Sequence, residues 1–358
     1  MTHPDCMQNT PSASEAIDID RASGDRASDM PRCGGPPEVM AAAYITTEGE
    51  LTIRQQPVPK PGPGEILLRT AVSALCGTDL HRFRGATSYG TDTDVYGHES
   101  VGAVVRCDSG RFNPGQRVLH VPFPSDGRVF APYQLARETN VVPLPDELTA
   151  RTAVFAQQLG TVIYALRNFW PSPTPPRRAF VAGAGPAGLL FIQLLRQRGC
   201  TEVYVHEPDA HRSRLAVTFG ALPATAASPT AELSVDASGM IGVRHECWQR
   251  TDQHGIIGVY GLPDHEPGDL EISVLELVSK NLRLVGAIGS QAEPGLVSFR
   301  EAIHLLETAK INVEPLVSHE IGLAELPHTA LRAAHVQDNI VKVLVTFPGP
   351  PASDAESI

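Results

Sequence analysis

The hydrophobic positions of the chain follow one pattern before about residue 148 and another after it. Between residues 41 and 148, short aliphatic runs such as ILLRTAV, VGAVV and RVLHV alternate with the turn sequences PGPG, NPGQ and PSDGR. Short strands separated by Pro- and Gly-containing turns are typical of an all-β fold. This pattern predicts a small barrel-like β domain in the first part of the chain.

From residue 148 to 167 the apolar residues recur at helical spacing, and a Pro-rich segment follows at 171–176. Further along, the apolar runs AFVAG, ELSVDASG and LRLVGAIGS end in small residues. Strands that are apolar throughout are typical of a parallel sheet covered by helices on both faces. The second part of the chain therefore predicts an α/β fold with a doubly wound parallel sheet.

The size and charge of the chain narrow its class. Its 358 residues, 42% of them hydrophobic and 19% charged, are enough for two buried cores. The net charge of −11 and the lack of a basic block argue against a nucleic-acid partner. The chain has no apolar run of about 18 residues and no secretory leader, which predicts a cytoplasmic protein without a membrane span. Six scattered cysteines indicate reduced thiols.

Both ends of the chain are predicted to lie outside the folded domains. Residues 1–38 are rich in Ser, Asp, Pro and Gly and show no apolar periodicity. Such a segment cannot bury enough apolar surface to offset the entropy lost on ordering, so we expect a disordered tail. Residues 348–358 are predicted to form a C-terminal tail.

Side chains that can carry chemistry are concentrated between residues 75 and 100. Cys76 offers a thiolate, His98 an imidazole and Glu99 a carboxylate, all of which tetrahedral zinc accepts as ligands. Thr78 and His81 follow Cys76 closely, so a hydroxyl and a second imidazole can form a proton path beside the metal. The alternative is that the cysteine is a small buried hydrophobe and the histidine a satisfied interior group. The spacing alone leaves both interpretations open.

A Gly-rich sequence opens the second domain. Gly183, Gly185 and Gly188 form a G-x-G-x-x-G run that includes Pro186 and lies between an apolar strand and an apolar helix. Such glycines let the backbone approach the pyrophosphate of a dinucleotide, whose charge the helix N-terminus favours. Glu207 ends the next strand, 19 residues after Gly188 (207 − 188), where an acid binds the adenosine ribose. Because this carboxylate repels a 2′-phosphate, we expect NAD, with NADP as the alternative.

The sequences CGTDLH and GHES resemble the catalytic-zinc signature of the medium-chain alcohol and polyol dehydrogenases. The likeness extends from about residue 40 to residue 347. It favours the zinc interpretation over the packing one. It also implies a β-rich, GroES-like catalytic domain formed by residues 39–159 and 296–347, and a Rossmann domain at residues 160–295.

The same resemblance assigns roles around the metal. Asp79 would orient the histidine ligand and fix its tautomer, the alternative being a surface-turn residue. Gln157 occupies a position where the polyol dehydrogenases have a Glu that approaches the zinc. The alternative is that Gln157 only forms hydrogen bonds nearby. Glu99 is the favoured third protein ligand beside Cys76 and His98.

Two basic residues are assigned to the cofactor by the resemblance. Arg212 matches a ribose-contacting position, and Lys342 matches a position near the cofactor phosphates. A solvated lysine at the end of a strand is the alternative for Lys342.

The chain also departs from the family pattern. Residues 116–135 lack the four closely spaced cysteines that hold a structural zinc in most zinc alcohol dehydrogenases, so one zinc per chain is expected. In their place we expect a strand that runs on through residues 120–130. The spacer at 220–233 is short, which predicts that one βα unit is lost or vestigial.

Together these features predict a zinc-dependent, NAD(P)-linked oxidoreductase that interconverts a secondary alcohol and a ketone by hydride transfer. Resemblance to polyol, threonine and deoxyinosamine dehydrogenases favours a polyol, sugar or cyclitol as the small-molecule substrate. We also expect a homo-oligomer, either a dimer or a tetramer. The alternatives are a cyclitol or enone C=C reductase of the same superfamily and a catalytically silent cofactor-binding protein.

Overall fold

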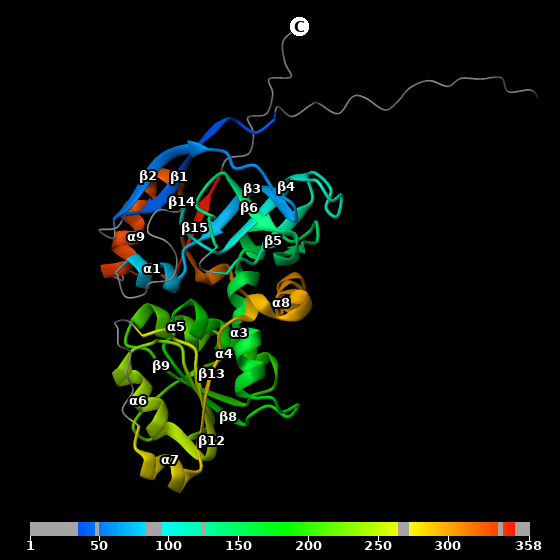
Figure 1. The fold of residues 1–358 in the computed structure, drawn as a ribbon. Coiled ribbons are helices and arrows are strands. Elements are labelled where there is room, and N and C mark those ends of the chain that lie inside the picture. Colours follow the sequence, from blue (N-terminus) through cyan, green and yellow to red (C-terminus); the bar gives the residue numbers. More distant parts are fainter. Residues whose placement is uncertain are drawn as a thin grey trace, which may run out of the picture. The chain divides into compact units, whose positions relative to one another are not determined.

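The structure of the protein is a computed structural model (Figure 1). It describes residues 35–46, 50–83, 95–123, 126–263, 272–335 and 339–347. The chain divides after Pro36, and the elements named below belong to the unit that begins at Pro37. The predicted tail at 348–358, and residues 1–34 of the predicted N-terminal tail, lie outside the described residues.

A mostly antiparallel sheet is built from the first part of the chain and from two strands near its end. Its strands are β3 (Glu65–Ala74), β4 (Ser100–Cys107), β5 (Arg117–His120), β6 (Tyr133–Arg137), β7 (Val141–Pro143), β14 (Val317–Gly322) and β15 (Lys342–Thr346). The order is β14-β15-β3-β4-β5-β7, and β6 also pairs with β3. The strands β1 (Val39–Ile45) and β2 (Leu51–Pro57) form a separate antiparallel pair. This is the predicted β-rich domain.

The second sheet is parallel throughout. Its strands are β8 (Arg178–Ala182), β9 (Glu202–His206), β10 (Leu222–Pro223), β11 (Ala231–Asp236), β12 (Thr251–Val259) and β13 (Arg283–Gly286). The order is β10-β9-β8-β11-β12-β13. Four helices alternate with these strands: α4 (Pro186–Gln197), α5 (Ala210–Thr218), α6 (Ile241–Arg250) and α7 (Val274–Lys280). The predicted doubly wound α/β sheet is confirmed.

Alternate residues of the central strand β8 enter two different cores. Ala179 and Val181 belong to the large core that also contains residues of α3 (Phe155–Phe169) and α4, whereas Phe180 packs in a second core with Trp248 of α6. Side chains of a strand point alternately to opposite faces, so helices cover both faces of this sheet. Because both faces of β8 are buried, its sequence after Arg178 is apolar throughout and does not alternate between apolar and polar residues.

The remaining helices are α1 (Gly77–Phe83), α2 (Ala150–Ala153), α8 (Val297–Glu307) and α9 (Leu326–His335). The helix predicted from 148 to 167 is present as α2 and α3. Thr149 caps α2 by accepting a hydrogen bond from the Thr152 amide, as a helix N-cap does. A side chain at Gly160 would overlap Phe299 of α8, so the glycine allows these two helices to pack closely.

The structure tests two expectations about secondary structure, the lost or vestigial βα unit at 220–233 and the strand through 120–130. The strand β10 has only two residues, and no helix lies between it and β11, all of which is described, so the vestigial βα unit is confirmed. The expected strand through residues 120–130 is wrong, because β5 ends at His120. Pro122 follows, and its missing N–H cannot take part in a strand ladder.

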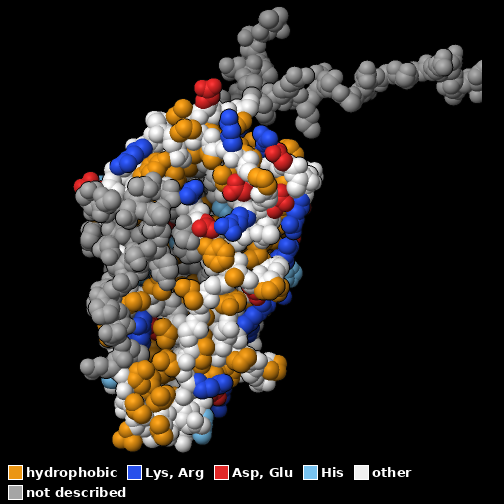
Figure 2. Space-filling model, viewed as in Figure 1, with side chains coloured by type: hydrophobic (Ala, Val, Ile, Leu, Met, Phe, Trp, Pro, Cys, Tyr) orange, Lys and Arg blue, Asp and Glu red, His pale blue; other side chains and the backbone are white. Residues whose placement is uncertain are grey.

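Apolar side chains gather over α7 in the space-filling view (Figure 2). Val274, Leu275 and Val278 of this helix are 67%, 81% and 70% exposed, and Leu284 of the neighbouring edge strand β13 is 40% exposed. A large exposed apolar patch typically marks an interaction surface. The expected homo-oligomer stays a prediction.

Within the described part of the chain, no helix is long and apolar enough to cross a membrane.

A buried polar network ties the strands of the β domain together. The amide of Gln134 on β6 donates to Thr70 on β3 at 2.8 Å and to Ser100 on β4 at 3.0 Å, and its oxygen lies 2.8 Å from His120 Nδ1 on β5. His120 is 2% exposed. Burial lowers the pKa of His120 to about 4, although Gln134 and Asp126 partly oppose this shift. The folded protein therefore holds this imidazole in its neutral form.

We predict that His120 makes the stability of the fold depend on pH between about 4 and 6.5. Its pKa is lower in the folded than in the unfolded state, so the unfolded state binds the extra proton as the pH falls. The contribution is therefore complete above pH 6.5 and is lost toward pH 4, by about 3 kcal/mol in the limit. Urea unfolding of wild type and His120→Gln across this range measures it. Equal pH dependence of the two proteins would contradict the prediction.

Candidate functional site

The predicted metal ligands meet where two neighbouring strands come together. Cys76 follows β3, and His98 and Glu99 immediately precede β4. Because β3 and β4 are antiparallel with Ser73 opposite Ser100, the end of one strand lies beside the start of the other. Residues 22 positions apart in the sequence (98 − 76) are thereby brought together.

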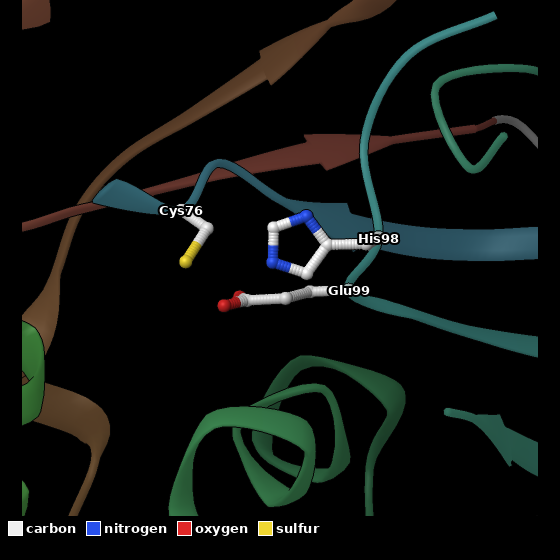
Figure 3. A group of neighbouring side chains, drawn as sticks. All are labelled: Cys76, His98 and Glu99. Atoms are coloured by element: carbon white, nitrogen blue, oxygen red, sulfur yellow. The ribbon is translucent and has the colours of Figure 1, made fainter. Parts of the chain in front are cut away.

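The side chains of Cys76, His98 and Glu99 point toward one another (Figure 3). One potential ligand atom from each lies within 4.8 Å of the others. His98 and Glu99 are 5% and 0% exposed, and Cys76 is partly exposed. The group therefore combines two deeply buried ligands with one that opens toward the surface, as expected of a metal site that leaves a position for substrate.

Asp79 joins two of these ligands. Its Oδ1 lies 3.1 Å from Nδ1 of His98, and its Oδ2 accepts a hydrogen bond from the Cys76 amide at 2.9 Å. Nε2 of His98 is therefore the ring nitrogen available to a metal. The surface-turn interpretation of Asp79 is wrong, since the residue is only 3% exposed.

The charges around His98 favour a cation at this point. Burial alone lowers the pKa of the imidazole, but the carboxylate of Asp79 and the sulfur of Cys76 outweigh it and raise the pKa well above its usual range. A position that attracts a proton so strongly also attracts a metal ion, which competes with the proton for the same nitrogen.

Lys342 contacts Glu99 in the interior. Its Nζ lies 2.6 Å from Oε2 of Glu99, and both side chains are 0% exposed. The Nζ also donates to Oε1 of Gln158 on α3 at 3.3 Å. Burial lowers the pKa of Lys342, but the nearby charges of Glu99 and Cys76 raise it more, so the lysine is an ammonium. The solvated interpretation of Lys342 is wrong, and its predicted contact with cofactor phosphates stays a prediction.

Gln157 lies on α3, one residue before Gln158. Its side chain is 2% exposed, and its Nε2 has no hydrogen-bond partner within the described part of the chain. A buried donor without a partner costs free energy, so this amide is available to a bound group. Metal binding by Gln157 stays a prediction, whereas Glu99 does lie in the ligand cluster.

Thr78 and His81 lie on α1, directly after Cys76. The thiol of Cys76 lies 3.8 Å from the Thr78 hydroxyl. Positions three apart on a helix share a face, which places Thr78 and His81 on the same side of α1. The proton path through these two residues stays a prediction, and Thr78 at its start lies beside Cys76, one of the candidate metal ligands.

The Gly-rich sequence forms the turn between β8 and α4. Gly183 has a φ of +94°, and a Cβ at Gly188 would lie 1.9 Å from the Gly183 carbonyl oxygen, so both positions require glycine. A Cβ at Gly185 would meet nothing within 4 Å. Pro186 opens the helix at its first turn. The arrangement leaves open space at a helix N-terminus, as pyrophosphate binding needs.

Glu207 lies beside the Gly-rich loop. Arg212 lies beside the segment that leads into β15. Oε2 of Glu207 accepts a hydrogen bond from the Ala184 amide at 2.7 Å, and Oε1 accepts one from the Asp209 amide at 2.9 Å. Arg212 donates to the Ile340 carbonyl at 2.7 Å, and its buried Nε has no hydrogen-bond partner within the described ranges. Glu207 thus closes the Gly-rich loop, and the ribose contacts of both residues stay predictions.

Comparison with known proteins agrees with this arrangement. Residues 62–146 match the alcohol dehydrogenase GroES-like domain. Sorbitol dehydrogenase of Gallus gallus is 24% identical over 79% of this chain and 90% of its own length. L-threonine 3-dehydrogenase of Pyrococcus abyssi is 26% identical over 74% of this chain and 86% of its own. By these matches the chain is similar to the medium-chain zinc alcohol and polyol dehydrogenases, at 24% and 26% identity to the two relatives named.

The fold of this chain is also that of solved structures. The 2R,3R-butanediol dehydrogenase of Bacillus subtilis superposes with a TM-score of 0.76 at 23% identity, covering 86% of this chain and all of the other. L-idonate 5-dehydrogenase of Escherichia coli gives a TM-score of 0.72 at 20% identity, covering 86% of this chain and 98% of the other. These likenesses confirm the combination of a Rossmann sheet and a GroES-like β domain.

Sequence reasoning missed two residues of the candidate site. Gln158, the partner of Lys342, is the second residue of a Gln-Gln pair, which is itself an unusual sequence for a buried helix. Tyr260 follows β12, and its hydroxyl lies 2.7 Å from Thr161 Oγ1 on α3. Burial raises the pKa of Tyr260, and the charges of Cys76 and Glu99 raise it further, so the phenol stays neutral.

We predict that Asp79→Asn weakens zinc binding by about 10- to 100-fold, because the histidine ligand loses the charge that orients it. Competition with a chromophoric chelator measures the affinity. Asp108→Asn, which removes an exposed partner of Arg106, is the control and leaves zinc binding unchanged. Equal zinc affinity of Asp79→Asn and wild type would contradict the role of Asp79.

Proposed function

We propose that the protein is a zinc-dependent, NAD(H)-linked dehydrogenase that interconverts a secondary alcohol and a ketone. The observation that carries the proposal is the buried group of Cys76, His98 and Glu99, held by Asp79. When bound, zinc polarises the substrate oxygen and the nicotinamide exchanges hydride with the substrate carbon. The residues of the chain hold these groups and move the proton.

Charge balance supports a divalent metal. With Cys76 as a thiolate, the cluster holds three negative side chains, Cys76, Asp79 and Glu99, and one positive side chain, Lys342. The difference is two negative charges (3 − 1), which a divalent cation would neutralise with His98 in its neutral form. Unbalanced buried charge is costly, so with a thiolate at Cys76 the donor set fits a divalent cation better than a monovalent one. The mixture of sulfur, nitrogen and oxygen donors also suits zinc.

The cofactor is proposed to lie across the C-terminal edge of the parallel sheet. The open space at Gly185 and the N-terminus of α4 support a pyrophosphate site. The carboxylate of Glu207 at the same loop supports NAD over NADP, because it would repel a 2′-phosphate. The structures of two proteins of this fold were solved with NADH and with NADP, respectively, so both cofactors belong in an activity screen.

Proton transfer is assigned to Thr78 and His81. The Thr78 hydroxyl lies beside the Cys76 sulfur, where a substrate hydroxyl would lose its proton. It would accept that proton while passing its own toward His81 and the solvent. A proton exit of this kind is needed for alcohol oxidation but not for reduction of a C=C bond, in which the proton arrives at carbon.

A polyol, sugar or cyclitol is the proposed substrate class. The names of relatives support it, since they include sorbitol dehydrogenase, 2R,3R-butanediol dehydrogenase and galactitol-1-phosphate dehydrogenase. A cyclitol with adjacent secondary hydroxyl groups shares the chemistry of these substrates.

We predict that the purified protein contains about one zinc per chain and oxidises or reduces at least one member of a panel of polyols, cyclitols and their ketones. The described residues offer one Cys-His-Glu group, which sets the expected metal content. Elemental analysis and absorbance of the reduced nicotinamide measure the two results. Zinc without turnover of any alcohol or ketone, but with turnover of an enone, would favour the reductase alternative. Absence of zinc would contradict the proposal.

We also predict that Thr78→Val lowers turnover by about 100-fold or more while zinc and NADH binding are kept, because the first step of the proton path is lost. Steady-state rates on the best substrate of the panel measure this effect.

Thr78→Ser is the matched control, since it keeps the hydroxyl and restores most of the rate. His81→Ala is expected to be milder, because water can replace a group at the solvent end of the path. Wild-type turnover by Thr78→Val with metal and cofactor bound would show that the proton leaves by another route.

A further inference from the structure

A buried ion pair lies at the C-terminal edge of the parallel sheet, away from the metal ligands. Asp236 is the last residue of β11 and is 0% exposed, and Arg244 on α6 is 6% exposed. Nε of Arg244 donates to Oδ2 of Asp236 at 2.6 Å, and its Nη2 donates to the Gly261 carbonyl at 2.9 Å. One guanidinium therefore holds the end of β11 and the segment that follows β12.

The second oxygen of Asp236 organises the turn that follows β11. Oδ1 accepts hydrogen bonds from the Ser238 amide at 3.0 Å, the Ser238 hydroxyl at 2.9 Å and the Gly239 amide at 3.0 Å. The carboxylate thus joins the turn after β11 to the segment after β12 through Arg244. A carboxylate on a short side chain can accept all of these hydrogen bonds at once, and the bonds then fix the position of the side chain.

The two segments pack closely against each other and against the Gly-rich loop. A Cβ at Gly239 would lie 1.8 Å from the Leu262 carbonyl oxygen, which leaves no room between the segments. A Cβ at Gly183 would lie 3.1 Å from the Ser238 Cβ. Asp236 is also the direct register partner of Ala182, the last residue of β8 before the Gly-rich loop.

The position of this contact in the sheet is what connects it with a ligand. From β8, the chain first builds the sheet outward through β9 and β10 and then returns to the other side with β11. In doubly wound sheets, ligands bind at the strand ends where the order reverses in this way. Asp236 and Arg244 therefore hold the segments that lie beside the Gly-rich loop at this point of the sheet.

A contribution to the stability of the fold does not explain the buried ion pair between Asp236 and Arg244. Two other buried ion pairs, His98–Asp79 and Lys342–Glu99, belong to the metal cluster. Replacing a buried ion pair by apolar side chains is often neutral or stabilising, so this kind of contact contributes little net stability. Its use lies in fixing one geometry, and the geometry it fixes borders the open space at Gly185.

We propose that Asp236 and Arg244 are a positioning pair for the dinucleotide, holding the turn at 237–239 and the segment at 260–262 in the shape that binds the cofactor. This inference rests on the proposed NAD site at the Gly-rich loop. Neither side chain is required to touch the cofactor. The pair acts through the backbone of Ser238, Gly239 and Gly261.

The test compares two methionine variants of the full chain. Arg244→Met removes the proposed positioning contact. Arg178→Met removes an ion pair with Asp252, which joins the N-terminal ends of β8 and β12 in the same sheet, and the Arg178 side chain also donates to the Thr230 carbonyl. Fluorescence titration with NADH gives the dissociation constant, and zinc content and thermal melting are measured in parallel.

We expect Arg244→Met to raise the dissociation constant for NADH about 10-fold or more without loss of zinc, because the segments at 237–239 and 260–262 lose the contact that holds them in place. Arg178→Met is expected to keep the wild-type dissociation constant even where its melting temperature falls. An unchanged constant in folded Arg244→Met would overturn the inference. An equal loss in both variants would also overturn it, since the effect would then be general destabilisation.

Arg244→Lys keeps the inference testable if the methionine variant does not fold. Lysine keeps the charge beside Asp236 but cannot contact both that carboxylate and the Gly261 carbonyl in the same way. We expect weaker NADH binding than wild type, and wild-type binding by a folded Arg244→Lys would count against the pair. If wild type itself does not bind NADH, the proposed cofactor site fails rather than the role of Arg244.

Discussion

The buried contact between Glu99 and Lys342 is the constraint on which the candidate site depends. A carboxylate without access to water is costly in the folded state unless a positive group lies against it. The lysine that meets this need comes from β15, near the end of the chain, and the two residues are 243 positions apart (342 − 99). The carboxylate can therefore be buried only when β15 has returned to pair with β3. Pairing of β15 with β3 thus places the lysine that the Cys-His-Glu group needs.

The helix α3 connects this cluster with the parallel sheet. Its first turn carries Gln157 and Gln158, the second of which contacts Lys342. One turn later, Thr161 contacts the hydroxyl of Tyr260 at the end of β12. At its far end, Phe169 packs where a side chain at Gly258 of β12 would otherwise lie. A single buried helix thus relates the metal ligands to the strand ends that would hold a cofactor.

Sequence reasoning succeeded where the chemistry is local. The ligand types at residues 76, 98 and 99, the Gly-rich turn and the vestigial β10 all follow from short stretches of sequence, and the structure brings each group together as expected. Reasoning failed after His120, where a strand through residues 120–130 was expected in place of the missing four-cysteine segment. The strand ends at His120 instead, and the missing N–H of Pro122 cannot continue the ladder.

The partner of Lys342 could not be found from the sequence, because a local pattern does not specify long-range register. In β15 nearly every residue is buried, so a lysine at its start resembles a solvated strand end as closely as an interior ion. The same is true of Arg244, whose place on α6 has the spacing of an ordinary exposed arginine. Its burial becomes visible only when β11 and β12 lie side by side.

Three carboxylates in this chain each accept hydrogen bonds from backbone amides of a loop, and this shared role explains why the residues are acids. Asp79 links an imidazole to the Cys76 amide, Glu207 links the Ala184 and Asp209 amides, and Asp236 links Arg244 to the turn after β11. A neutral acceptor would leave amide N–H groups less well stabilised, because hydrogen bonds to a charged acceptor are stronger. Each acid holds the backbone of a segment that borders a proposed ligand position. The cost of ordering these loops is thus met when the chain folds, so a metal or dinucleotide that binds later meets groups already in place.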